Sequence, residues 1–237
     1  MKRSHRLFRL TTLALLLFSL NSEAAVGAEY YYALVFGSQS KPKRLRNTHT
    51  WATFVKAVGE GPDLNTYSLE VNTISWLPAT LDVKVLRPWP EQGVNLDLDQ
   101  TIQAMYAHGE TITLWGPFLV RKELYERSLK ISSVLASGAA QYRAISGPAN
   151  LLVSDCIHAV AAVDPQFGRG HYPLIRIGKP ASRYIAHQFR MRSVFDQSLY
   201  DNSWLIPRLG LNGYPIEVVP GSAIPPEACG LCRDHND

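Results

Sequence analysis

Apolar positions follow a strand-like pattern over the first part of the chain. Residues 30–36 (YYYALVF) are apolar and aromatic and end at Gly-Ser, which predicts a buried first strand followed by a loop. Residues 49–56 (HTWATFVK) are rich in Thr, Trp, Phe and Val, which suit a pleated surface. Further strands are expected at residues 67–76 and 81–86, separated by Pro78. Short links between neighbouring strands favour an antiparallel meander.

The spacing of apolar residues becomes helical after residue 95. Residues 95–108 (NLDLDQTIQAMYAH) begin with Asn, carry acids in the first turn and precede a glycine, so they predict a helix. Residues 122–136 predict a second helix, with apolar side chains on or near one face. Short strands are expected at 111–115, ended by Gly-Pro, and at 141–145. The chain is therefore expected to have an α+β fold, with an antiparallel sheet packed against helices.

The first 28 residues have the layout of a cleavable signal peptide. Four basic residues precede an apolar run at 10–20, and this run of about 11 residues is shorter than the roughly 20 that a spanning helix needs. Small residues follow, and cleavage is expected after Ala28, with Ala24 as the second choice. An uncleaved N-terminal membrane anchor is the alternative. We expect a secreted or periplasmic protein with no stable membrane span after cleavage.

Composition limits the classes of partner. The chain holds 24 Lys and Arg and 20 Asp and Glu; residues 1–28 contain four of the basic and one of the acidic residues, so 20 and 19 remain and the net charge is +1. This near-neutral balance gives no support for a nucleic-acid or membrane-surface partner, and the basic run at 41–46 (KPKRLR) is interpreted as a solvated loop. Residues 29–225 are long enough for one domain, and 226–237 form a C-terminal tail.

Candidate chemistry centres on Cys156. Residues 154–163 (SDCIHAVAAV) predict a helix with Ser154 as its N-cap and with Asp155 and Cys156 in its first turn. The positive end of a helix stabilises an anion, so a cysteine there can have a lowered pKa and act as a thiolate nucleophile. The Asp155 carboxylate opposes this effect. Cys156 is therefore either a nucleophile or an inert, buried thiol.

The tail contains the other two cysteines, Cys229 and Cys232, in a C-x-x-C pair. In an oxidising compartment they can form a disulfide with each other, which would leave Cys156 as the odd thiol. With His235 they also have part of the spacing of a zinc site, but no second close Cys/His pair completes it. We expect a small disulfide or a flexible thiol pair, and no metal or other cofactor, because nucleotide-binding, metalloprotease and serine-hydrolase motifs are also missing from the sequence.

A cysteine nucleophile needs a base, and His49 is the candidate. His158 lies two residues after Cys156, about 200° around the helix, so it points away from the thiol. His49 begins a strand and can face a helix packed across the sheet; a structural, hydrogen-bonded histidine is the alternative. Glu70 and Asn72 share one face of the next strand, and either can orient the imidazole. The remaining histidines fall in the signal peptide, in helical surface patterns, at the far end of the cysteine helix or in the tail: His5, His108, His171, His187 and His235.

This order of residues resembles the circularly permuted papain-like hydrolases, which include the permuted relatives of NlpC-type peptidases and the lecithin retinol acyltransferase group. The resemblance rests on the strand histidine, the polar residue on the next strand, and a cysteine opening a helix in the form D-C-I-H-A-V. It implies a permuted papain-like fold, with Cys156 as nucleophile, His49 as base, and Glu70 or Asn72 as the third residue. Asp155 stands where the resemblance predicts Asn. The HTWATF and CIHAV segments are also similar to an uncharacterised family of exported bacterial proteins, which implies no activity.

The sequence therefore suggests two functions. The first is an exported cysteine hydrolase or acyltransferase that acts on an amide or ester through Cys156 and His49; the resemblance implies a cell-wall peptide as a substrate. The second is a non-catalytic secreted domain with a binding or structural role, in which Cys156 is a buried helix residue. The two hypotheses differ in whether the side chains of His49 and Cys156 face each other.

Overall fold

The computed structural model describes residues 27–146, 152–164, 177–192 and 201–221. Most of the expected signal peptide, at residues 1–26, and the tail with Cys229 and Cys232 lie outside the described residues. Within the described ranges, no helix is long and apolar enough to cross a membrane.

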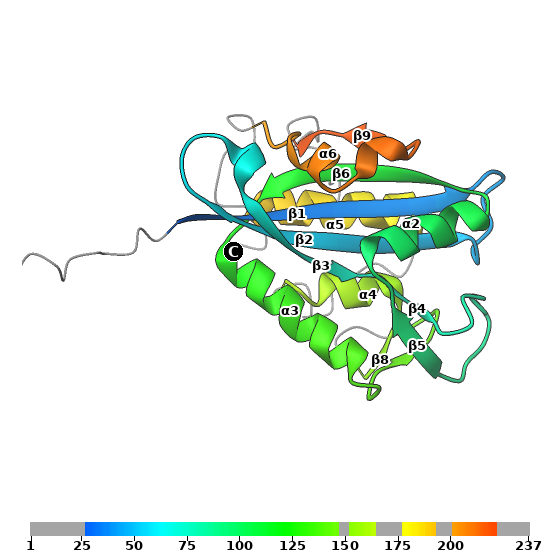
Figure 1. Cartoon of the computed structure of the whole chain (residues 1–237). Coiled ribbons are helices and arrows are strands. Elements are labelled where there is room, and N and C mark those ends of the chain that lie inside the picture. The colour runs from blue at the N-terminus through cyan, green and yellow to red at the C-terminus, as the bar shows by residue number, and fades with distance from the viewer. Residues whose placement is uncertain (1–26, 147–151, 165–176, 193–200, 222–237) are drawn as a thin grey trace, which may run out of the picture.

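A five-stranded sheet forms the centre of the fold (Figure 1), with the strand order β3-β2-β1-β6-β9. Its strands are β1 (Ala28–Ser40), β2 (Thr48–Gly59), β3 (Ser68–Ile74), β6 (Glu110–Leu119) and β9 (Glu217–Val219). The pairs β1–β2, β2–β3 and β1–β6 are antiparallel, so the first three strands form the expected meander. β9 pairs with β6 in parallel.

Strand β6 is longer than the sequence predicts. Gly116 and Pro117 predict an end at Trp115, yet the strand continues to Leu119. Its pairing with β1 shifts register between Ala33 and Val35, which marks a bulge or irregularity opposite the Gly-Pro pair. Such a bulge accommodates a residue that cannot donate to the ladder, so proline does not end the strand here.

A smaller sheet lies below the main one, with the order β4-β5-β7-β8. It consists of β4 (Trp76–Pro78), β5 (Glu91–Asn95), β7 (Gln141–Tyr142) and β8 (Val153–Ser154). The strand expected at 81–86 is wrong: these residues belong to an irregular loop between β4 and β5. Their alternating pattern places Val83 and Val85 against a pocket instead of a neighbouring strand.

The N-terminal cap sets the start of helix α2, and helix α3 follows the sequence prediction. Asp97 caps α2 (Leu98–Ala107) through a capping box with Gln100, so this helix starts later than the expected residue 95, and Asn95 instead ends β5. Helix α3 (Lys122–Ala136) has the predicted bounds. The other helical elements are α4 (Cys156–Ala161), α5 (Lys179–Arg192), α6 (Leu205–Arg208) and the 3-10 turns η1 (Leu64–Thr66) and η4 (Leu211–Gly213).

The helices divide between the two faces of the main sheet (Figure 1), which confirms the α+β class. One core, here called the α4-side core, joins Ala52, Phe54 and Cys156 with residues of α3, α4 and α5. The other, the α2-side core, joins Trp51 and Val55 with residues of α2, α6 and η4. β2 therefore contributes alternate side chains to two buried layers, as a strand between two layers must.

The contact between Gly93 and Trp76 gives a first test of the packing. A Cβ at Gly93 would lie 2.1 Å from Cζ2 of Trp76, whose ring is buried and whose Nε1 donates to the carbonyl of Ser154 at 3.2 Å. Gly93→Ala is therefore expected to lower the free energy of unfolding by about 1–3 kcal/mol, measured by urea denaturation. Gly213→Ala is the control, because a Cβ there meets nothing within 4 Å. Equal losses in both variants would contradict this packing.

Candidate functional site: a pocket beside Cys156

Cys156 is the first residue of α4, directly after the short strand β8. The N-cap is Asp155 and not the expected Ser154: the Asp155 side chain accepts a hydrogen bond from the backbone N–H of His158 at 2.8 Å. Ser154 is instead the last residue of β8, so the helix begins one residue later and ends earlier than predicted. The turn from strand to helix places Cys156 between the main sheet and the smaller one.

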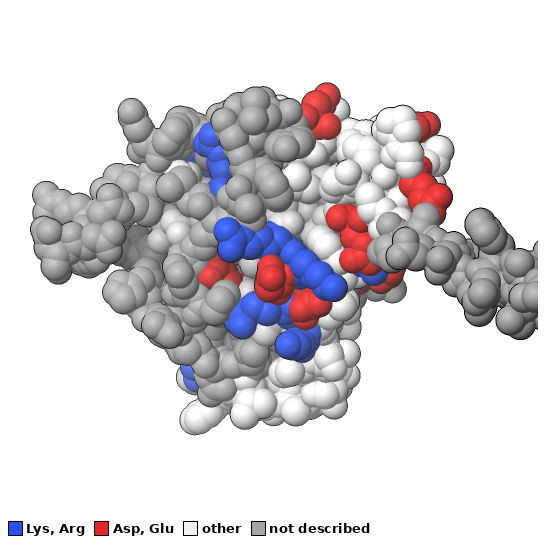
Figure 2. All heavy atoms as spheres, turned by 90° about the vertical axis from the view of Figure 1, so that its left-hand side faces the viewer, with Lys and Arg blue, Asp and Glu red and all other residues white. Residues whose placement is uncertain are grey.

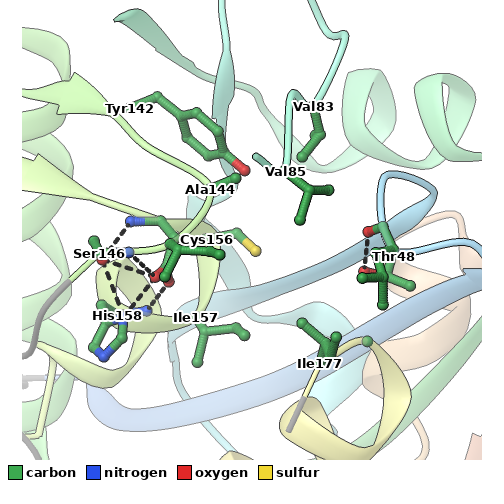
Figure 3. A pocket seen from close by; sticks show the side chains of 14 residues that line it. Thr48, Val83, Val85, Tyr142, Ala144, Ser146, Cys156, Ile157, His158 and Ile177 are labelled. Atoms are coloured by element: carbon green, nitrogen blue, oxygen red, sulfur yellow. Dashed lines mark hydrogen bonds and ion pairs between the residues drawn. The ribbon is translucent and has the colours of Figure 1, made fainter. Parts of the chain in front are cut away.

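A buried polar cluster holds this turn. Asp155 Oδ2 accepts from the hydroxyl of Ser146 at 2.7 Å and lies 2.7 Å from Nδ1 of His158. The backbone N–H of Asp155 in turn donates to Ser146 Oγ at 3.1 Å. Figure 3 shows the His158 ring on the far side of α4 from the sulfur of Cys156, as its helical spacing predicts. The Asp155 carboxylate and the His158 imidazole therefore brace the helix start and do not serve the thiol.

A pocket of about 160 Å³ opens beside Cys156. In Figure 3 the sulfur of Cys156 and the hydroxyl of Tyr142 both point into it, while Val83, Val85 and Ile177 form other parts of its wall. The lining is mostly apolar and comes from five parts of the chain: Leu45, Thr48, Val83, Val85, Tyr142, Ala144, Ile145, Ser146, Asp155, Cys156, Ile157, His158, Ile177 and Gly178.

The Cys156 thiol is kept neutral. Burial first, and the neighbouring Asp155 carboxylate second, raise its pKa to about 12, although the backbone N–H groups of Thr50, Ile157 and Cys156 itself act to lower it. This raised pKa favours the inert, buried thiol over a thiol activated by the helix N-terminus. Loss of hydration outweighs the field of a helix only six residues long, because the charged form loses most when a group is buried.

His49 faces the opposite core from Cys156. The residue is 1% exposed; its imidazole stacks on Trp51 at a ring distance of 5.4 Å and forms a hydrogen bond of 2.9 Å between Nε2 and Ser75 Oγ. Trp51 belongs to the α2-side core, whereas Cys156 belongs to the α4-side core. The sheet thus separates the two side chains, and the predicted pairing of His49 with Cys156 is not formed.

The side chain that β2 presents towards α4 and α5 at this point is Thr50. Its hydroxyl hydrogen-bonds Ser182 of α5 at 2.8 Å, and its backbone N–H interacts with the Cys156 sulfur. Thr48, two residues earlier on the same face, lines the pocket. Within the described part of the chain, His158 is the single imidazole in the pocket lining.

Glu70 and Asn72 share a face, as predicted, but that face meets α3. Glu70 pairs with Lys56 at 3.4 Å and accepts from the Tyr125 hydroxyl at 3.5 Å. Asn72 Nδ2 donates to Ser128 Oγ at 2.9 Å. Neither orients His49. The partner of that imidazole is Ser75, which no sequence pattern marks, because Ser75 lies between two strands and carries no motif.

Comparison with models of protein families, with curated proteins and with solved structures finds no match for this chain. In the ranges that the structure describes, no group of three or more His, Cys, Asp and Glu side chains could hold a metal ion.

The burial of His49 predicts a pH dependence of stability. Burial lowers its pKa from the ordinary 6.5 to about 3, so between these values the unfolded chain binds a proton that the folded chain does not. The contribution of the neutral imidazole to the free energy of unfolding is fully present above pH 6.5. It falls as the pH decreases, with a slope that approaches about 1.4 kcal/mol per pH unit. Unfolding in urea at pH 4 to 7 should show this slope reduced in His49→Gln and unchanged in His108→Gln, whose imidazole is exposed. An unchanged slope in His49→Gln would show that His49 is solvated.

The neutral thiol predicts slow alkylation. In a Cys229→Ser/Cys232→Ser background, iodoacetamide at pH 8 should label native Cys156 at least about a hundredfold more slowly than in urea, because thiolate is the reacting form. His49→Gln should leave the native rate unchanged. Thr50→His/Ser182→Ala, which places an imidazole on the face of the thiol and makes room for it, should raise that rate, with circular dichroism as the check of folding. Fast labelling of the native protein that is lost in His49→Gln would contradict this prediction and support His49 as the base for Cys156.

Proposed function

We propose that this chain is an exported, non-catalytic binding domain, and that the pocket beside Cys156 binds a small apolar group. One observation carries the proposal: β2 directs Thr50, and not His49, towards Cys156. The export assignment rests on the basic and apolar pattern of residues 1–28.

The proposal keeps the permuted papain-like arrangement but not its chemistry. A helix opened by cysteine and packed against a strand is in keeping with that architecture. Thiol catalysis needs a base within hydrogen-bond reach of the sulfur, and the pH must permit some thiolate. Here the candidate base lies across the sheet, and the pKa of the Cys156 thiol is about 12. A hydrolase or acyltransferase acting on cell-wall peptide therefore has less support than a binding domain.

The dimensions of the pocket limit what it can bind. A volume of about 160 Å³ is close to that of an apolar protein cavity that accepts one benzene ring. Val83, Val85 and Ile157 offer dispersion contacts, while the Tyr142 hydroxyl supplies one polar group at the wall. The expected occupant is an aromatic ring or the end of a branched alkyl chain.

Binding is tested with toluene as the probe, followed by methyl NMR. The methyl signals of Val83, Val85, Ile157 and Ile177 should shift with a Kd on the order of 0.1–1 mM, as expected for seven heavy atoms in an apolar site. Ala144→Phe fills the pocket and should abolish the shifts. Ala107→Phe adds the same ring at an exposed position and should retain them. Shifts that persist in Ala144→Phe, or that occur elsewhere, would contradict the proposal.

The catalytic alternative is tested on the same preparations. Hydrolysis of p-nitrophenyl acetate should be equal, within about twofold, for the wild-type chain and Cys156→Ala, because a neutral thiol without a base is a weak nucleophile. If the wild type is at least about tenfold faster and His49→Gln loses that advantage, the chain is a thiol hydrolase and the proposal fails.

A further inference from the structure

Two loops meet at the opening of the pocket and form what we call the mouth surface, residues 41–46 and 82–89. The first loop joins β1 to β2, and the second joins β4 to β5; Figure 1 shows both at one end of the molecule, opposite the start of β1. They are neighbours in space because Leu45, Val83 and Val85 line the same pocket.

Large apolar side chains project from this surface. Leu86 is 92% exposed, Trp89 is 71% exposed and Leu45 is 49% exposed. Leu86 lies in a turn closed by the hydrogen bond from Arg87 N–H to the Lys84 carbonyl at 3.0 Å. Trp89 lies between Pro88 and Pro90, which restrict the backbone around it. The backbone that carries both side chains is thus restricted, so little backbone entropy is lost when a partner buries them.

The mouth surface also carries an excess of positive charge. Four exposed cations lie in the first loop: Lys41, Lys43, Arg44 and Arg46. In the second loop Lys84 balances Asp82, and Arg87 pairs with Glu91 at 3.2 Å. Lys41 helps to lower the pKa of Glu217, and that carboxylate also pairs with Lys179 at 3.5 Å. The first loop is held in place by hydrogen bonds that include Lys43 Nζ to the Ile177 carbonyl at 3.1 Å and Thr48 Oγ1 to the Leu45 carbonyl at 2.9 Å.

The opposite end of the molecule differs. Figure 2 shows Lys and Arg intermixed there with Asp and Glu. Lys56 pairs with both Glu29 and Glu70, and Lys122 pairs with Glu126. The near-neutral composition expected after removal of residues 1–28 therefore conceals a local asymmetry, with unbalanced positive charge beside protruding apolar side chains at the mouth surface.

We propose that the mouth surface docks on an anionic lipid membrane, with Leu86 and Trp89 inserted into the interface and the cations of residues 41–46 on the headgroups. A protein partner would need a hollow to receive each protruding side chain, whereas a fluid bilayer accepts them without one. Tryptophan favours the interfacial region, and basic residues beside it attract anionic lipids. The docking rests on this surface alone. Its consequence, that the pocket takes an apolar group from the bilayer, rests on the proposed function.

The test uses the fluorescence of Trp89 in the full chain. Trp51, Trp76 and Trp115 are buried and Trp204 is half-buried, so exposed Trp89 should dominate any change on binding. Vesicles of phosphatidylglycerol and phosphatidylcholine should shift the emission to the blue, and brominated acyl chains should quench it, while pure phosphatidylcholine should do so at least about tenfold less effectively. Trp89→Phe should remove the quenched component. Residues 1–28 are the same in every sample, so differences between variants report the mouth surface.

Matched variants separate the two contributions. Lys43→Glu/Arg44→Glu should weaken the quenching at least about tenfold, while Lys122→Glu/Lys130→Glu on α3 should not. Leu86→Ser should weaken it several-fold, while Val71→Ser, which removes an exposed apolar side chain from β3, should not. The proposal would be overturned if no vesicle shifts or quenches the Trp89 emission, or if an oligo(dT) strand changes the emission and lipid does not.

The toluene titration distinguishes this failure from failure of the proposed function. Leu86→Ser does not alter a side chain that lines the pocket, so toluene should still shift the methyl signals in that variant. Loss of vesicle binding with retained toluene binding would overturn docking alone. Retained vesicle binding without toluene binding would overturn the pocket and leave the docking surface intact.

Discussion

Strand β2 is the constraint on which the candidate site depends, because it runs between two buried cores and its side chains alternate between them. His49, Trp51 and Val55 face the α2-side core, while Thr50, Ala52 and Phe54 face the core that contains Cys156. A shift of one residue along this strand would exchange every side chain between the two layers. Whether the His49 imidazole can meet the Cys156 thiol is thus decided by which face of β2 position 49 occupies.

The environment of Cys156 shows how burial and local electrostatics compete. The start of α4 offers backbone N–H groups that favour a thiolate, and the polar cluster of Asp155, Ser146 and His158 fixes the geometry of the turn. Burial and the adjacent carboxylate nevertheless raise the pKa of the thiol to about 12. The same burial creates an apolar wall beside the sulfur, so the features that disfavour a nucleophile are those that favour a small apolar ligand.

The pocket and the mouth surface share structural elements, which links the two proposals. Leu45 belongs to the basic loop and lines the pocket, and the loop with Leu86 and Trp89 also supplies Val83 and Val85. Along residues 82–86, half-buried Val83 and Val85 line the pocket, while Asp82, Lys84 and Leu86 are exposed to solvent. A membrane contact made by the outward set would lie directly at the entrance that the inward set forms.

Local patterns in the sequence determined much of the framework: the antiparallel meander of β1 to β3, the bounds of α3, and a helix opened near Cys156 with His158 turned away from the thiol. Helical spacing, caps and strand composition act over a few residues, so they can be read directly from the chain. Only the tertiary structure decided which way His49 points, because β2 is apolar on both faces and its pattern marks neither. The pKa of Cys156, the partner Ser75 and the pocket wall at 83–85 likewise arise from residues distant in sequence, and burial of a group is set by what packs over it.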